Sequence, residues 1–248
     1  MSGTATSISA SAPSVPVAVD PIRRLAIDPN VAGDNFSEED AFVERLVMWA
    51  SAKFGFEQLV TAKEEHFWKT GKAFPDDTFY HLRMAHFLDY FLFQRPLDRG
   101  STLHVGKTPF TVYQEEAPPC RPGWELEGYC HSLFEVVKIS RHGLIVEDVL
   151  AGARLSVSRK SGERHDGFKR KDLVQGFLYG MGSRFVLSRG LLFHPERAAG
   201  TIKKQVKKAK KSDDFDHNKV LSRLARQQIR HLRHPHVDAR LIYSQEPR

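Results

Sequence analysis

The chain has 248 residues, 41% of them hydrophobic and 27% charged, which supplies enough apolar material for a substantial core in one or two domains. Its longest apolar run, residues 84–93, is far shorter than the ~20 residues that a membrane-spanning helix needs. Two cysteines, Cys120 and Cys130, are too few for a disulfide framework, and the N-terminus lacks the basic and apolar segments of a secretory signal. We therefore expect a soluble, cytoplasmic protein.

Changes in composition along the chain predict four parts. They are a disordered leader (1–36), a helical region (37–131), a small β-module (132–195) and a basic helical arm (196–248). The leader begins with small and polar residues, has no charged side chain before Asp20, and offers too little apolar area to offset the entropy of ordering. No internal repeat is present in the sequence.

The helical region begins with a capping pattern, since Ser37 is followed by three acidic residues and then by apolar residues at helical spacing. Further helices are predicted over residues 56–68, from residues 75–77 to just before Pro96, and around residues 109–116. The one that ends near Pro96 is apolar nearly all round, which is typical of a central, buried helix.

The pattern changes from helical to strand-like after Cys130. Short strands are predicted over residues 133–139, 144–150, 154–159, 173–179 and 184–188. We expect an α+β fold in which the helical layer packs on a small five-stranded antiparallel sheet or barrel. Aromatic residues in these strands interleave with basic ones; we interpret the aromatic residues as core and the basic loop over 158–171 as added surface.

The basic arm carries the charge that distinguishes this chain. Residues 201–248 contain 13 Lys and Arg against 5 Asp and Glu, whereas residues 1–200 contain 24 against 25. Two helices are predicted here, separated by residues 212–216. In the first, six lysines fall within about 160° of arc: Lys203, Lys204, Lys207, Lys208, Lys210 and Lys211. In the second, five cations fall within about 80°: Lys219, Arg223, Arg226, Arg230 and Arg233.

Apolar residues occupy the opposite side of each basic helix, and Asp213, Asp214 or Asp216 is expected to cap the second one. Charge sorted onto one face indicates contact with a polyanion. The leading hypothesis is a non-enzymatic accessory protein that binds nucleic acid, or a ribonucleoprotein, through these eleven cations. DNA and RNA both remain open, because the sequence has no zinc finger or RNA-recognition motif. An adaptor that docks an acidic protein, a solvated helix face and a disordered solubilising tail are the alternatives.

Candidate chemical sites are few. His86 and Asp89 are three residues apart on a predicted helix, and a carboxylate that orients a histidine is the beginning of an acid–base pair. An enzyme of unknown reaction at this pair is a further alternative. The sequence has no phosphate-binding or nucleophile motif, so we interpret the pair as a satisfied polar contact in the core. Neither a metal nor a cofactor is expected. The sequence has two groups of potential zinc ligands, and neither has the number and spacing of ligands that a standard zinc site needs. The groups are His231, His234 and His236, and Cys120, Cys130 and His131.

Three stretches, residues 79–97, 132–136 and 146–152, are similar to a loosely defined group of uncharacterised bacterial proteins. Members of that group share an aromatic helix followed by a small β-module. The resemblance covers residues 77–195 and leaves the basic arm outside. It implies a bacterial, cytoplasmic origin and an α+β architecture, and no activity.

Overall fold

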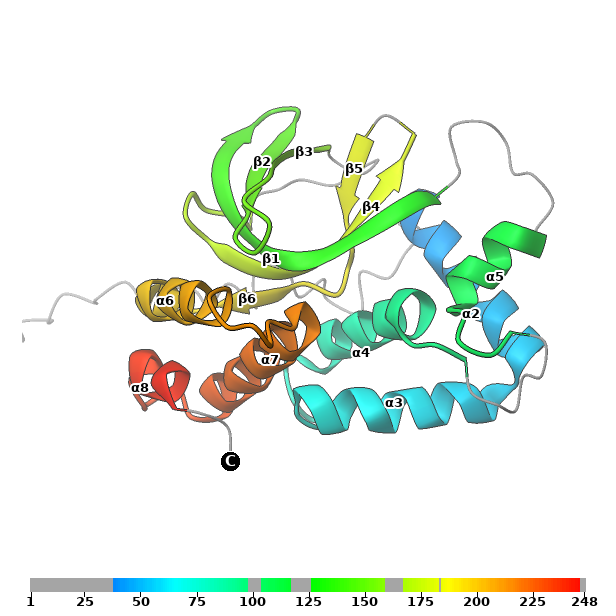
Figure 1. The fold of residues 1–248 in the computed structure, drawn as a ribbon, viewed down its shortest axis with the longest axis horizontal. Coiled ribbons are helices and arrows are strands. Elements are labelled where there is room, and N and C mark those ends of the chain that lie inside the picture. The colour runs from blue at the N-terminus through cyan, green and yellow to red at the C-terminus, as the bar shows by residue number, and fades with distance from the viewer. Residues whose placement is uncertain (1–37, 98–103, 117–125, 159–166, 183, 246–248) are drawn as a thin grey trace, which may run out of the picture.

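The computed structural model describes residues 38–97, 104–116, 126–158, 167–182 and 184–245. The predicted leader therefore lies outside the described residues. The strands lie on one side of the molecule and the helices on the other, with α3 and α8 farthest from the strands (Figure 1). This arrangement confirms the predicted α+β class, with a helical layer packed on a sheet. No helix in the described ranges is long and apolar enough to span a membrane.

The N-terminal part of the described chain folds into helices close to the predicted ranges. They are α2 (Glu38–Phe54), α3 (Phe56–Thr70), α4 (Tyr80–Asp89), the π-helical segment η2 (Tyr90–Gln94) and α5 (Pro109–Glu116). Gly55 separates α2 from α3, and Gly71 ends α3 with a positive φ of 93°. Residues 75–77 form a turn rather than the first turn of α4, because the Asp77 carboxylate accepts a hydrogen bond from the Phe74 amide at 2.8 Å. The buried, central position expected for this helix is confirmed by η2, whose aromatic and leucine side chains are all buried.

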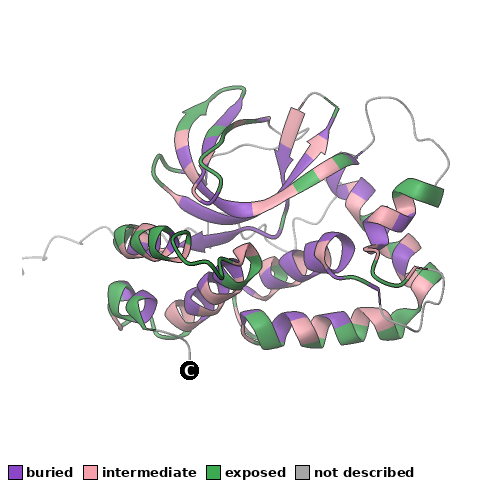
Figure 2. Cartoon of the chain, in the orientation of Figure 1, coloured by how far each residue is buried: buried purple, intermediate pink, exposed green. Residues whose placement is uncertain are grey.

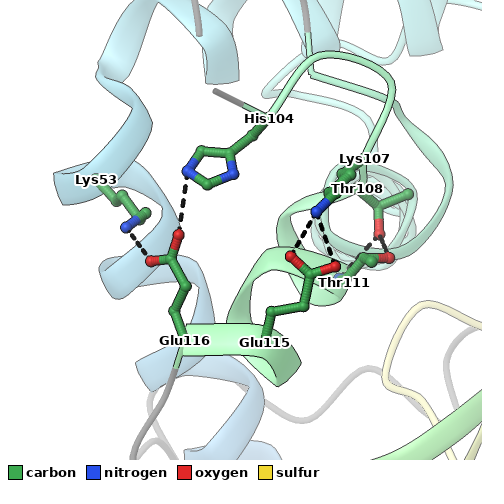
Figure 3. Close-up of polar contacts among 7 residues, drawn as sticks. All are labelled: Lys53, His104, Lys107, Thr108, Thr111, Glu115 and Glu116. Atoms are coloured by element: carbon green, nitrogen blue, oxygen red, sulfur yellow. Dashed lines mark hydrogen bonds and ion pairs between the residues drawn. The ribbon is translucent and has the colours of Figure 1, made fainter. Parts of the chain in front are cut away.

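Polar contacts clamp α5 against α2 at the edge of the helical layer (Figure 3). Glu116 of α5 forms ion pairs with Lys53 of α2 and, at 3.1 Å, with His104. The Lys107 ammonium lies 2.6 Å from the Glu115 carboxylate, and Thr108 accepts a hydrogen bond from the Thr111 amide at the start of α5. These contacts use every charged group drawn in Figure 3 within the protein itself, so this cluster is a structural clamp.

The sheet has six strands in the described residues, one more than predicted. They are β1 (Leu126–Ser140), β2 (Gly143–Asp148), β3 (Arg154–Ser158), β4 (Leu173–Met181), β5 (Arg184–Leu187) and β6 (Leu192–His194). β6 was not predicted, because its three residues before Pro195 are too few to show a strand period. The long first strand also begins several residues earlier than expected, at Leu126.

The strand pairings close a small barrel. β1 pairs with β4 from Leu126 to Glu135 and with β2 from Phe134 to Ser140, and β2 continues to β3. One parallel pair, Val157 with Phe185, joins β3 to β5, and β5 returns to β4. The sheet is therefore mixed rather than wholly antiparallel. β5 and β6 pair with the same edge of β4. β6 pairs with the first residues of β4, and β5 pairs with its last residues.

The C-terminal helices are α6 (Ala199–Ala209), α7 (His217–Arg233) and α8 (Ala239–Ser244), preceded by the 3-10 turn η3 (Glu196–Ala198). The apolar faces of α6 and α7 form one core cluster with side chains of β1 and β4, among them Leu133 and Leu173. The apolar faces of the two basic helices thus dock on the chain's own sheet. Contacts between α7 and α3 attach the same helix to the helical layer.

Candidate nucleic-acid interface

α6 exposes its lysines from a firmly anchored helix. Ile202 and Val206 are buried on the inner side, and the outer side alternates between exposed and half-buried residues (Figure 2). Five of the predicted lysines are exposed, and we call them the lysine face: Lys204, Lys207, Lys208, Lys210 and Lys211. No described acidic side chain lies within 4.0 Å of their ammonium groups. Lys203 differs, because its ammonium forms an ion pair with Glu135 of β1 at 2.7 Å.

The cations of α7 have other surroundings. Lys219 is 81% exposed and lies 3.9 Å from Asp216. Arg226 donates to the backbone oxygen of Trp68, and Arg230 donates to the Gln245 side chain at 3.2 Å. Arg233 donates to Asp77 at 2.7 Å and to the Lys72 backbone oxygen at 2.8 Å. Arg223 is half-buried. The structure therefore engages Arg226, Arg230 and Arg233 in contacts within the chain.

The acidic linker between the two helices lies beside the lysine face along the chain. The Asp216 carboxylate accepts a hydrogen bond from the Lys219 amide at 3.1 Å, which confirms the predicted cap of α7 and selects Asp216 from the three candidates. Asp213 and Asp214 are exposed and do not cap the helix. Their negative charges limit the positive potential at the C-terminal end of α6.

His86 and Asp89 do not form the contact that their spacing predicts. The Asp89 carboxylate accepts a hydrogen bond from the Tyr179 hydroxyl of β4. His86 instead packs against other rings, with centroids 5.3 Å from His66 of α3 and 5.4 Å from His131 of β1. The ring nitrogens of His86 have no hydrogen-bond partner in the described part of the chain.

Burial dominates the chemistry of this histidine cluster. It lowers the pKa of His66, His86 and His131 well below the ordinary value, with smaller contributions from the neighbouring charges of Arg83 and of other histidines. The rings are therefore neutral at pH 7. His86 and Asp89 are each only 2% exposed, so neither side chain offers a substrate the access that a catalytic pair needs.

The described residues hold no group of three or more His, Cys, Asp or Glu side chains placed to bind a metal ion. His234 and His236 pack ring against ring at 6.1 Å. Cys120 lies outside the described residues. Cys130 is a free thiol whose pKa is raised to about 11 by burial and by Asp148, so it is protonated and weakly nucleophilic at pH 7.

The aromatic residues of the β-module lie where the core interpretation places them. Phe134, Phe168, Phe177 and Tyr179 are buried, and Phe185 packs against the core cluster that contains Phe134 and Phe168. Most of the basic loop over 158–171 lies outside the described residues, although Lys169, Arg170 and Lys171 at its end are exposed. The barrel thus presents no described row of exposed aromatic side chains.

Comparison with known proteins places no further constraint on the site. No protein-family model matches the chain, and no curated protein or solved structure matches it.

Proposed function

We propose that this protein binds nucleic acid along its phosphate backbone through the lysine face of α6. The observation that carries the proposal is the set of five exposed ammonium groups without an acidic partner in the described residues. Three of these lysines are on α6, whose other side is fixed in the core, and Lys210 and Lys211 are in the turn that follows it. Lysines held on a rigid helix make sequence-independent phosphate contacts and release counterions when they do so. Lys219, at the start of α7, is a further exposed cation of the same C-terminal segment.

The arrangement on α6 differs from that of an ordinary solvated helix. Exposed helices usually mix both signs of charge, and opposite charges four residues apart stabilise them. The residues of α6 include no Asp or Glu, and Lys204 and Lys208 place like charges four residues apart. Such a pair destabilises an isolated helix by about 0.2–0.5 kcal/mol. A polyanion on this face would remove that repulsion, whereas a purely solubilising role gives no reason for it.

Salt-dependent binding provides the test. Fluorescence anisotropy of a labelled 20-base-pair DNA duplex and of the corresponding RNA duplex would be measured between 50 and 200 mM salt. The triple variant K204Q/K207Q/K208Q is compared with the control R45Q/K138Q/R154Q, which removes the same charge from exposed positions elsewhere. For DNA, we expect the α6 variant to reduce the slope of log K against log salt by about 2.7, at about 0.9 for each lost phosphate contact. The control is expected to leave the slope within about 0.5 of the unmodified protein.

Two results would overturn the proposal. One is the absence of salt-sensitive binding by the unmodified protein at 50 mM salt. The other is an equal loss of affinity in the α6 variant and in the control, which would indicate a general effect of net charge. Recovery of an acidic protein through the lysine face, from a protein that does not bind nucleic acid, would favour the adaptor interpretation instead.

A further inference from the structure

A second surface lies where the C-terminal end of α3 and the loop after it meet α7. It carries two exposed aromatic side chains, Trp68 (78% exposed) and Phe74 (43% exposed). Three cations lie at this surface: Lys72 and Arg233 contact the ring of Phe74, and Arg226 binds the backbone oxygen of Trp68. We call these five residues the aromatic seam. The sequence pattern predicted the arginines as part of a stripe on α7 but gave no sign of the aromatic residues beside them.

The backbone at Gly71 packs closely against the side chain of Ile229 in α7, and this contact positions the aromatic seam. Gly71 has a positive φ of 93°, and a Cβ at this position would lie 2.7 Å from Cγ2 of Ile229 in α7. Only glycine allows the loop to turn here and approach α7 so closely. Arg226 then reaches the backbone oxygen of Trp68, and Arg233 reaches the backbone oxygen of Lys72. The aromatic rings and the cations thus belong to one contiguous, supported surface.

The cations also contact the aromatic rings. The guanidinium carbon of Arg233 lies 5.0 Å from the ring centroid of Phe74, and the ammonium of Lys72 lies 5.2 Å from the same centroid. The indole of Trp68 remains largely in water. A tryptophan side chain gains more from burial than almost any other residue, so one left exposed, with Arg226 bound to its own backbone oxygen, indicates a contact surface.

We propose that the aromatic seam stacks the bases of single-stranded nucleic acid; this inference rests on the proposed function and narrows its substrate class. Exposed aromatic rings flanked by Arg and Lys are the combination that binds single strands, because every unpaired base offers a face for stacking. A duplex covers its base faces internally and cannot use Trp68 in this way. Lys72 and Arg226, which have no acidic partner in the described residues, supply charge that complements the adjoining phosphates.

Acidic neighbours determine which part of the nucleic acid the seam contacts. Asp77 is held by Arg233 at 2.7 Å, so one carboxylate is already neutralised. Glu64 and Asp76 are exposed near the two aromatic residues in the sequence. Their charges oppose close phosphates, so base stacking on Trp68 supplies more of the contact than phosphate binding does. Loss of the indole is therefore expected to reduce affinity with little change in salt dependence.

The test compares single and double strands with two variants of Trp68. W68L removes the stacking surface and keeps an apolar side chain, whereas W68F keeps an aromatic ring. Anisotropy with labelled dT20 and with a 20-base-pair duplex is expected to show W68L about 5- to 150-fold weaker on dT20. Duplex affinity is expected to stay within twofold. W68F should retain most of the dT20 affinity. Because Trp68 is largely exposed, thermal melting should be the same for all three proteins, which serves as the folding control.

Intrinsic fluorescence gives an independent measurement. Saturation with dT20 is expected to quench the emission of Trp68, and W68F should lose that quenching although Trp49 and Trp124 remain. Unchanged dT20 affinity in W68L, or an equal loss on both substrates, would overturn the seam while leaving the lysine face intact. The same conclusion would follow if K204Q/K207Q/K208Q lost all binding to nucleic acid while W68L bound dT20 as tightly as the unmodified protein. No binding of any nucleic acid by the unmodified protein would overturn the proposed function itself.

Discussion

Acid is expected to unfold this protein, because it buries neutral histidines deeply. His66 and His86 are each 2% exposed and His194 is 5% exposed. Burial lowers the pKa of His66, His86 and His131 well below the ordinary value and that of His194 to about 3. In the unfolded chain the same side chains titrate near pH 6.5. Below that pH the unfolded chain binds protons that the folded protein cannot accept, so stability is complete above pH 6.5 and falls as the pH drops.

The magnitude follows from linkage. For one histidine that stays neutral in the folded state, the free energy of unfolding falls by about 0.1 kcal/mol at pH 7.5 and by about 1.4 kcal/mol at pH 5.5. Four such histidines together remove about 5 kcal/mol between these two pH values. A domain of ordinary stability has only about 5–15 kcal/mol in total. The protein is therefore expected to be marginal or unfolded at pH 5.5.

Urea unfolding followed by circular dichroism at pH 7.5 and pH 5.5 measures this difference. H86L removes one of the four protons, so its loss of stability between the two pH values should be smaller than that of the unmodified protein by about 1.4 kcal/mol. H142Q alters an exposed histidine in the turn between β1 and β2 and should leave the difference unchanged. Equal stability of the unmodified protein at the two pH values would refute the reasoning, as would the same pH dependence in H86L.

Three further changes test the packing that supports both surfaces. D216A removes the cap of α7 and should cost about 1 kcal/mol in urea unfolding, whereas D214A should cost less than about 0.5 kcal/mol. G190A places a Cβ 2.4 Å from backbone atoms of α4 and should cost about 1–3 kcal/mol or more; G200A, with open space around it, should be neutral or stabilising. R83M removes a buried guanidinium with two unpartnered nitrogens among the described residues, and it should match or exceed the parent stability by up to about 4 kcal/mol. A loss of more than 2 kcal/mol in R83M would contradict this.

The parts of the fold that the sequence predicts are those with local signals. The helix boundaries at Gly55 and Gly71 and the turns between β1, β2 and β3 are encoded by glycine and by changes of period within a few residues. β6 and α8 have three and six residues, too few to show a period. The parallel pairing of Val157 with Phe185 depends on closure of the barrel, which no local pattern records.

The candidate sites also differ in whether a local sequence pattern or long-range packing forms them. The lysine face is a periodic feature of one helix, so helical spacing alone locates it. The aromatic seam depends on bonds between residues far apart in the sequence, such as Arg226 with Trp68 at a separation of 158 residues and Arg233 with Asp77 at 156. The histidine cluster likewise unites side chains from α3, α4 and β1. Only the packing of the layers brings these groups together.

The two basic helices differ in which basic residue they carry, and this difference indicates different roles. The helical positions of the charges alone do not distinguish the two helices. The basic residues of α6 are all lysine, and those of the α7 stripe are one lysine and four arginines. A guanidinium makes several directed hydrogen bonds and stacks on rings, whereas an ammonium is strongly hydrated and stays mobile. Arg226 and Arg233 accordingly bind backbone oxygens and an aromatic ring within the chain, and the lysine face stays in solvent. The net charge of the C-terminal segment therefore overstates what a polyanion would meet there. The lysine face supplies freely available charge, whereas Arg226 and Arg233 hold the backbone at Trp68 and Lys72 against α7.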